Sequence, residues 1–257
     1  MERTYLKKGG FTLIELLVVI AIIALLLSII MPALKKAKEQ AMAMGCMSNQ
    51  RQTSIATLTY SEENDGYNIP SWQQMAFVTN ITPEHWYTFI KPYYDDTKGV
   101  LLCPRGKKPG MTDDIYNNGV VGTATEAYFA SPTVHTLNDD DHFGGFGYNN
   151  WLEYDSGGDD KAILKRTSAK QPGEVPVFGD CTWADSGWVA ETDTIPLPED
   201  RQDPHYAPDA GWLKRFCLDR HKDAINMALM DGHVERVDVD DLLGFRWHGK
   251  WDKSLIP

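Results

Sequence analysis

One carboxylate, Glu15, lies inside an apolar run of 21 residues from Phe11 to Met31. An α-helix rises about 1.5 Å per residue, so this run is long enough to cross the roughly 30 Å core of a bilayer. A charge at that depth is unfavourable, so Glu15 is either a tolerated interfacial carboxylate or a group that meets a cation. If the chain were cut after Gly10, Phe11 would gain an α-ammonium group. That cation could pair with Glu15 between two staggered helices.

A second candidate for chemistry is His221, which nine residues separate from Asp231 and Gly232. The pair could act as acid and base in a membrane-anchored hydrolase. The favoured interpretation is structural, with Asp231 in a turn and His221 capping or packing beside a strand. His233 begins a segment that lacks the second histidine of the HExxH zinc motif, and neither a GxSxG nor a GKS/T motif occurs. The sequence therefore predicts a protein that is not an enzyme.

Two acidic clusters offer the hard oxygen ligands that calcium prefers. They consist of Asp139, Asp140 and Asp141, and of Asp238, Asp240 and Asp241. Neither cluster follows the spacing of an EF-hand, and acidic loops are usually solvated. We therefore expect no cofactor, with calcium at these clusters as the minor alternative.

The elements that position these residues begin with one long helix, from about Phe11 to Glu63. Pro32 ends the apolar run and favours a kink. Beyond it, apolar residues recur at spacings of three and four, which predicts an amphipathic continuation that packs on a globular domain. They are Leu34, Ala37, Ala41 and Met44, followed by Ile55 and Leu58. Asn64-Asp65-Gly66 is a strong stop signal.

The rest of the chain predicts short elements between turns. Residues 83–90 suit a short helix, and residues 99–103 and 175–178 suit strands. The best hairpin joins residues 224–230 to residues 233–237 through a two-residue type I′ turn at Asp-Gly. That register places Leu229 opposite Val234, and the opposite parity of Val237 then requires a bulge or a strand end. The formal net charge of −11 argues against nucleic acid as a partner.

The segment from Lys7 to Glu15, KKGGFTLIE, closely resembles the processing site of type IV prepilins and type II secretion pseudopilins. This resemblance implies that a prepilin peptidase and N-methyltransferase cuts after Gly10 and methylates Phe11. It also implies that Glu15 guides docking between subunits. The leader would face the cytoplasm and the remainder the opposite side, which the basic residues flanking the run do not decide.

A second resemblance covers most of the chain. His221, nine residues and then Asp231-Gly232 match the H-X9-DG pattern of prepilin-like proteins of the planctomycete and lentisphaera type, where it is a domain signature. Further landmarks of that group are residues 46–52, 63–67, 102–104, 147–149 and 178–180. Residues 109–142 and 184–211 are variable insertions by the same comparison.

Four cysteines, without a CxxC pair, fit an oxidising compartment outside the inner membrane. Three pairings are possible. The preferred pairs are Cys46 with Cys103, which would tie the helix to the first strand region, and Cys181 with Cys217. Four free, buried thiols are the alternative.

These observations predict an α+β, pilin-like fold, in which a long N-terminal helix packs on a domain with an antiparallel sheet. The expected segments are a leader at 1–10, a membrane-spanning half-helix at 11–31, an amphipathic half-helix at 32–64, and a periplasmic or extracellular domain at 65–257 with its hairpin signature at 221–232. The expected role is a structural subunit of a type II secretion or type IV pilus-like filament. The expected location is the inner membrane, with a single pass and a periplasmic C-terminal domain, and a filament or the cell surface after processing. The alternative is a membrane-anchored binding module, with carbohydrate as one candidate ligand.

Overall fold

The computed structural model describes residues 12–70, 86–94, 99–108, 121–129, 143–152, 163, 165–186, 200–202, 212–216 and 218–251. The chain divides into two compact units, Met1–Ala41 and Met42–Pro257. Each unit is described by itself below.

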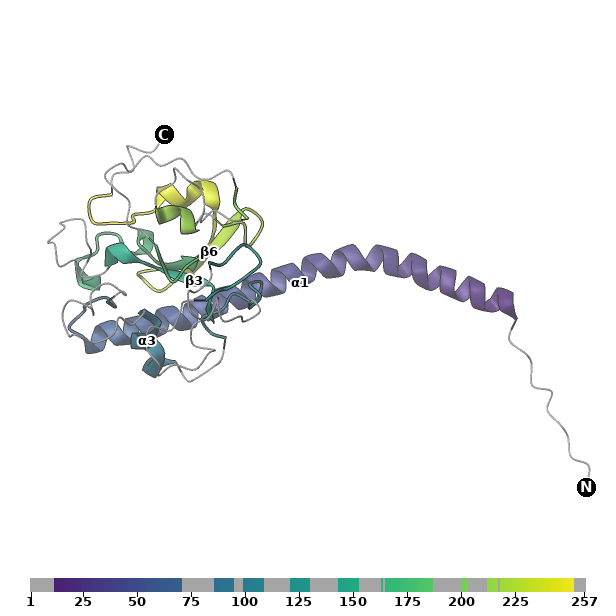
Figure 1. Cartoon of the computed structure of the whole chain (residues 1–257), viewed down its shortest axis with the longest axis horizontal. Helices are drawn as coiled ribbons and strands as arrows, with labels where there is room; N and C mark the ends of the chain where they lie inside the picture. The colour runs from purple at the N-terminus through teal and green to yellow at the C-terminus, as the bar shows by residue number, and fades with distance from the viewer. Residues whose placement is uncertain are drawn as a thin grey trace, which may run out of the picture. The chain divides into compact units, whose positions relative to one another are not determined.

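One helix, α1, runs from Leu13 to Glu63 over 51 residues, close to the predicted bounds (Figure 1). It continues through Pro32 without a break in its helical assignment, so the kink at this proline stays a prediction. In the first unit the large apolar side chains are exposed, from Val19 at 47% to Leu13 at 81%. The helix is long and apolar enough to cross a membrane, and its most apolar window has a mean hydropathy of 3.2.

The second half of α1 does not pack through the predicted apolar stripe. Met44 and Ile55 are exposed, at 65% and 54%. The buried face consists of small and polar side chains, namely Cys46, Gln50, Thr53, Ser54, Ala56, Thr57 and Ser61. The Gln50 amide donates a hydrogen bond of 2.9 Å to the main-chain oxygen of Asn226, so this face lies close to the backbone of a strand. Short side chains permit that approach, and Met44 and Ile55 face the outside.

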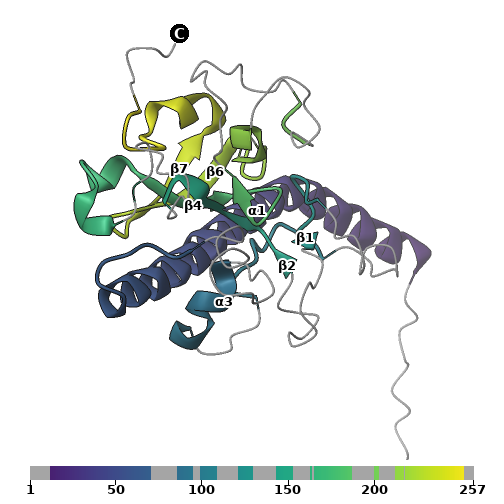
Figure 2. The ribbon, with the colours of Figure 1, turned by 60° about the vertical axis from the view of Figure 1, so that its left-hand side comes forward.

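A five-stranded sheet forms the centre of the second unit, in the order β5-β3-β4-β6-β7 (Figures 1 and 2). Four strands are antiparallel neighbours, and the short edge strand β5 pairs parallel to β3. These strands are β3 (Phe146–Asn149), β4 (Pro176–Asp180), β5 (Asp185–Ser186), β6 (Ala224–Leu229) and β7 (Val234–Asp238). A separate pair consists of β1 (Tyr128–Phe129) and β2 (Phe143–Gly144). The predicted α+β class with an antiparallel sheet is confirmed.

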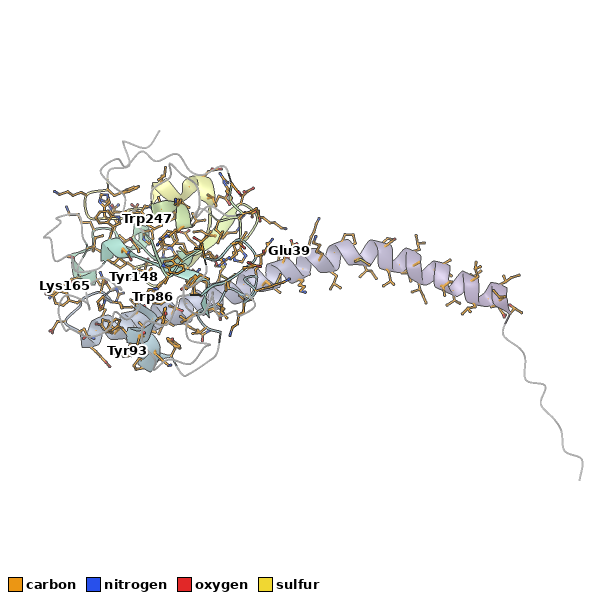
Figure 3. The ribbon with its side chains drawn as sticks, viewed as in Figure 1. Glu39, Trp86, Tyr93, Tyr148, Lys165 and Trp247 are labelled. Atoms are coloured by element: carbon orange, nitrogen blue, oxygen red, sulfur yellow. The ribbon has the colours of Figure 1, made fainter. Side chains whose placement is uncertain are left out.

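Both faces of this sheet are covered. On one side, Trp86 of α3 (Trp86–Ile90) packs with Tyr148 and Phe178, in the layer that contains α1 (Figure 3). On the other side, Trp247 packs on Phe216 of the 3-10 helix η7 (Trp212–Phe216). A further 3-10 helix, η8 (Val239–Gly244), completes that layer. Strand β6 is buried at every position because it has a core on each side.

The hairpin β6–β7 differs from the predicted one. Ala228, not Leu229, is opposite Val234, because the loop holds three residues rather than two. Gly232 has a φ of 95°, and its N–H donates to the Leu229 oxygen at 2.9 Å, as in a turn closed by a left-handed glycine. The register is continuous, and Val237 simply faces the opposite core from Val234, so no bulge is needed.

Other local predictions fared unevenly. The strand predicted at 175–178 is confirmed as β4, and the short helix near 83–90 is confirmed as α3 within the described part of that segment. The strand predicted at 99–103 is wrong, because those residues form turns. The Asn49 amide of α1 donates to the oxygens of Gly99 and Leu102 at 3.1 and 2.8 Å, which satisfies carbonyls that a strand would have paired.

Gly147 in β3 lies close to Cys181 and Trp183, which directly follow β4 in the chain. We expect Gly147→Ala to lower the free energy of unfolding by about 1–3 kcal/mol, because an added methyl group would overlap these residues. A β-carbon there would lie 2.5 Å from the Cys181 sulfur and 2.8 Å from the Trp183 main-chain oxygen. Gly244→Ala is the matched control, since nothing lies within 4 Å of its β-carbon position. Denaturant unfolding of the full chain, followed by tryptophan fluorescence, measures both. Equal stability of the two variants would contradict this packing.

Candidate functional site

The first candidate site is the start of α1, where Thr12 and Glu15 form a capping box. The Thr12 oxygen accepts from the Leu16 N–H at 3.3 Å, which makes Thr12 the N-cap. The Thr12 N–H donates to the Glu15 carboxylate at 2.8 Å, and the Thr12 hydroxyl donates to the same oxygen at 2.7 Å. In return, the Glu15 N–H reaches the Thr12 hydroxyl at 3.3 Å. Each residue thus satisfies a group that the helix start would leave unpaired.

This arrangement gives Glu15 a role that the sequence reasoning did not consider. Its carboxylate stabilises the positive end of the helix and is hydrogen-bonded before any cation arrives. Gly10 and Phe11 lie outside the described residues, so the cleavage and methylation positions stay predictions. The predicted cation is the α-ammonium group of Phe11 on a neighbouring helix. It would compete with Thr12 for the Glu15 carboxylate.

The second candidate site is a buried cluster wholly inside the second unit. Four segments supply it: α1 contributes Cys46, the turn at 99–103 contributes Cys103, the end of β4 contributes Asp180, and the segment before β6 contributes His221. One donor atom from each residue lies within 4.8 Å of all the others. Cys46, Cys103 and Asp180 have no exposed surface, and His221 is 5% exposed.

Asp180 is the residue on which the other groups converge. One carboxylate oxygen accepts from the Cys46 thiol at 3.3 Å and lies 3.6 Å from a guanidinium nitrogen of Arg220. The other oxygen lies 3.2 Å from His221 Nε2 and accepts from the Asn226 N–H at 2.9 Å. Burial alone would raise the pKa of Asp180, but His221, Arg220 and the Asn226 N–H outweigh burial and hold the pKa below its usual value. Asp180 is therefore an ionised carboxylate in the core.

His221 and Cys103 form a second contact, with 3.4 Å between Nε2 and the sulfur. Burial lowers the pKa of His221, but hydrogen bonds to Asp180 and Cys103 outweigh it and raise the pKa to about 9. Burial also raises the pKa of Cys103, but hydrogen bonds from Cys46 and His221 outweigh that effect and lower it to about 6. Burial and the hydrogen bond to Cys103 raise the pKa of Cys46 well above its usual value. At neutral pH the cluster thus contains an imidazolium, a thiolate and a thiol.

Arg220 supplies the remaining charge and is fully buried. Its guanidinium donates to the main-chain oxygens of Gly145, Thr123 and Glu126 at 2.8, 2.7 and 3.2 Å. Next to it, Lys222 and Asp223 both have positive φ, 60° and 54°, and the His221 N–H donates to the Ala224 oxygen at 2.9 Å. This tight turn, rather than the Asp231-Gly232 loop, holds two successive left-handed residues, and it fixes His221 at the entrance to β6.

The structure brings three of the predicted site residues together and adds two that sequence reasoning missed. Cys46 and Cys103 lie together with His221, so the two members of the first predicted cysteine pair are neighbours, and no disulfide joins them in this structure. The bond itself stays a prediction. Cys181 is buried, and its predicted partner Cys217 lies outside the described residues, so the second cysteine pair also stays a prediction. The sequence pointed to Asp180 only as the last residue of the landmark at 178–180. It pointed to Arg220 only as the residue before His221.

The other predicted residues lie apart from this cluster. Asp231 is exposed at the hairpin turn and pairs with His233 Nδ1 at 2.6 Å, so its partner is not His221. The acid–base pair of a hydrolase is therefore not formed. Of the predicted calcium ligands, Asp238 and Asp240 pair with Arg236 and Arg201, respectively. Within the described ranges, Asp238, Asp240 and Asp241 do not gather into a metal-type group. The residues 139–141 lie outside those ranges.

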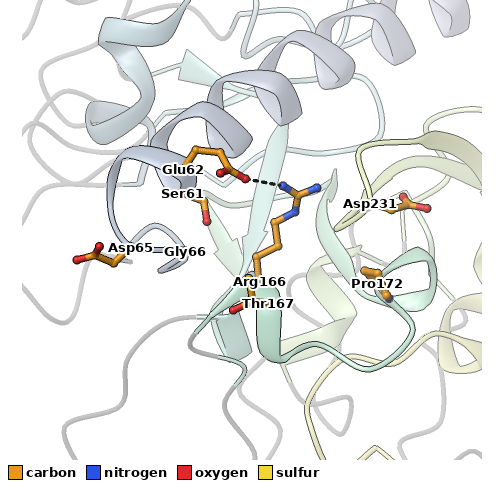
Figure 4. Close-up of a pocket in the computed structure, with 8 residues that line it drawn as sticks. All are labelled: Ser61, Glu62, Asp65, Gly66, Arg166, Thr167, Pro172 and Asp231. Carbon is orange, nitrogen blue, oxygen red and sulfur yellow. Dashed lines mark ion pairs between the residues drawn. The ribbon is translucent and has the colours of Figure 1, made fainter.

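A pocket of about 480 Å³ lies where the end of α1 meets the 165–172 segment and the hairpin turn (Figure 4). Glu62 and Arg166 form an ion pair across it at 3.6 Å. The lining residues are Ser61, Glu62, Asp65, Gly66, Arg166, Thr167, Pro172 and Asp231. Neither histidine nor cysteine lines this pocket, and it offers no activated nucleophile.

Exposed tryptophans can stack on sugars, so the burial of these side chains bears on the alternative of a carbohydrate-binding module. Trp86, Trp151, Trp247 and Trp251 are all buried, at 1–6% exposure, so they serve the cores. These four buried tryptophans therefore do not form a sugar-stacking surface. Most of the two variable insertions lies outside the described residues.

One comparison with known proteins matches. Residues 6–31 fit the family model described as the prokaryotic N-terminal methylation motif, which confirms the resemblance at Lys7–Glu15. The motif supports a type IV prepilin-like protein and a pilin-type precursor, a structural class that is not typically enzymatic. Together with the apolar helix it fits anchoring in the inner membrane. The match does not extend to the H-X9-DG element, and neither a curated protein nor a solved structure matches the chain.

Proposed function

We propose that this prepilin-like precursor is a structural subunit of a type II secretion or type IV pilus-like filament. A prepilin peptidase cuts after Gly10, methylates Phe11 and releases a subunit whose C-terminal domain faces the periplasm. The observation that carries the proposal is the position of the matched motif directly on α1, whose apolar half is exposed in the single chain. Packing many copies of this half-helix together would bury that surface.

We infer that Glu15 exchanges its hydrogen-bond partner when the subunit assembles. Glu15 accepts two hydrogen bonds from Thr12 in the single subunit. In the filament, the α-ammonium group of a neighbouring subunit's Phe11 displaces part of that pattern. The Thr12 bonds have a charge on the acceptor alone, whereas the ammonium–carboxylate contact joins two opposite charges and is therefore stronger. Its direction sets the axial register of neighbouring helices.

The test uses the full chain, produced in a host that contains a prepilin peptidase. We expect a mature N-terminus at N-methylated Phe11 and protein in the sheared filament fraction. Glu15→Gln should be processed normally yet yield at least about tenfold less filament, since each lost 1.4 kcal/mol of contact energy is a tenfold change. Glu39→Gln, on the same helix beyond the apolar run, is the control. Mass spectrometry of the N-terminus and the filament yield are the two readouts.

The outcomes separate the filament from a membrane-tethered module. A mature chain that begins anywhere other than Phe11 contradicts the processing step. Full filament yield from Glu15→Gln contradicts the role of Glu15. Correct processing with protein that stays in the membrane, for wild type and Glu15→Gln alike, favours the tethered module instead.

A further inference from the structure

The buried cluster of Cys46, Cys103, Asp180 and His221 has the composition of a metal site. Two sulfurs, one imidazole nitrogen and one carboxylate oxygen are the ligand types that zinc takes in proteins. They come from segments separated by as many as 134 residues, counted between Cys46 and Asp180. Their donor atoms nevertheless lie within 4.8 Å of one another in the core. Sequence spacing alone gives no sign of this convergence.

The distances fit a tetrahedron around a small cation. With metal–ligand bonds of about 2.0–2.3 Å, neighbouring ligand atoms in a tetrahedron lie about 3.3–3.8 Å apart. The observed separations are 3.4 Å between Cys103 Sγ and His221 Nε2, 3.3 Å between Cys46 Sγ and Asp180 Oδ1, and 3.2 Å between His221 Nε2 and Asp180 Oδ2. The two separations from Asp180 involve different oxygens of one carboxylate, so with either oxygen as the ligand two edges of the tetrahedron are close to these lengths before any rearrangement.

The charges also balance. Two thiolates, one carboxylate and a neutral imidazole around a divalent cation carry a formal charge of −1. Arg220, fully buried and 3.6 Å from the Asp180 carboxylate, supplies the compensating +1. A neutral total is what a core without solvent requires, because an uncompensated buried charge is strongly unfavourable. Arg220 would thus act as an outer partner that orients Asp180.

We propose that Cys46, Cys103, Asp180 and His221 bind one divalent cation of the zinc class as a structural site. Four protein ligands close the coordination sphere, and burial leaves no position for a substrate. The two sulfurs select a soft or borderline cation over calcium or magnesium. The bound cation fastens α1 to the turn at 99–103, to the end of β4 and to the entrance of β6. This proposal does not depend on the filament function.

The rival chemistry is the disulfide between Cys46 and Cys103. A disulfide uses only the two sulfurs, whereas a bound cation also uses the Asp180 carboxylate and the His221 imidazole. Oxidation would also remove both thiolate ligands, so one chain cannot hold the bond and the cation together. The two states are therefore mutually exclusive outcomes of one measurement.

The experiment purifies the full chain in detergent, anaerobically and without chelator, and measures bound metal by mass spectrometry together with the thiols titrated after denaturation. We expect one zinc per chain and no Cys46–Cys103 disulfide. Replacement of zinc by Co²⁺ should give the thiolate-to-cobalt charge-transfer absorption of a tetrahedral site. Cys103→Ser and His221→Ala should each reduce the metal content to nearly none.

Two controls keep the result decisive. Cys181→Ser removes a buried thiol outside the cluster and should retain the metal. His233→Ala removes an exposed imidazole beside Asp231 and Glu235, a surface group that could take up adventitious zinc, and should also retain it. If Cys103→Ser does not fold, the cobalt spectrum and thiol count of wild type still decide. A metal-free disulfide in wild type, or metal lost only with His233→Ala, overturns the proposal.

Discussion

Asp180→Asn is expected to lower the free energy of unfolding of the metal-free chain by about 3–5 kcal/mol, the usual cost of breaking a buried ion pair from one side. The substitution keeps the shape of the side chain and removes only its charge. Arg220 would then remain buried without the carboxylate it faces, and His221 would lose the ion pair that raises its pKa. Guanidinium unfolding of the full chain in detergent, with chelator and reductant present, measures the loss.

Asp231→Asn is the matched control for this substitution. Asp231 also pairs with a histidine, but both side chains are more than a third exposed, so solvent screens the interaction. We expect a loss below about 1 kcal/mol for that variant. A loss of the same size for both variants would mean that the three carbonyl oxygens around Arg220 suffice to stabilise its charge without Asp180.

The second large effect is the pH dependence of the free energy of unfolding. In the wild-type chain, two opposite contributions to it should cancel. The pKa of His221 is raised from 6.5 to about 9, so its stabilisation is complete below pH 6.5 and is lost as the pH rises through 9. The pKa of Cys103 is lowered from 9.0 to about 6, so its stabilisation is complete above pH 9 and is lost as the pH falls through 6. Between pH 6.5 and 9 the two slopes oppose each other. Folding moves one proton from thiol to imidazole without changing the number bound, so we expect nearly constant stability in metal-free wild type.

Cys103→Ser should expose the slope that belongs to His221. Asp180 still hydrogen-bonds the imidazole in this variant, so the pKa of His221 stays raised. Stability should then fall between pH 6.5 and 9, by about 2–3 kcal/mol. Unfolding curves at several pH values, with chelator, measure it, and Cys181→Ser should keep the flat profile. A wild-type chain that itself loses stability over this range would show that Cys103 remains a thiol.

The sequence predicted the fold well where a pattern is local. The length of α1 follows from the stretch between Thr12 and the Asn64-Asp65-Gly66 stop, which contains only Pro32 and Gly45 as poor helix formers, and both ends agree with the structure. The prediction of which face of its second half is buried was wrong. Apolar periodicity indicates a packing face only when the partner accepts large side chains. Here the partner is the backbone of β6, which Gln50 and the small hydroxyl residues approach closely.

The site was predictable only in part, for a physical reason. Cys46, Cys103 and His221 are chemically distinctive residues, and the sequence singled out each of them. Asp180 is one carboxylate among 36 acidic residues, and its importance follows from burial at the end of a central strand. The hairpin register failed for a similar reason: a glycine in the left-handed region closes two-residue and three-residue loops alike, and only the pairing of Ala228 with Val234 distinguishes them.

The contacts between α1 and the sheet have a consequence for the order of events during folding. Gln50 hydrogen-bonds to Asn226 across 176 residues, and Asn226 donates to the Ala43 oxygen across 183. Strand β6 therefore reaches its place only after nearly the whole polypeptide has emerged, and contacts this distant in sequence form slowly. Until then Gln50 of α1 lacks its main-chain partner, and the buried face of the helix is only partly covered. The β6–β7 hairpin is therefore among the last elements to join the domain.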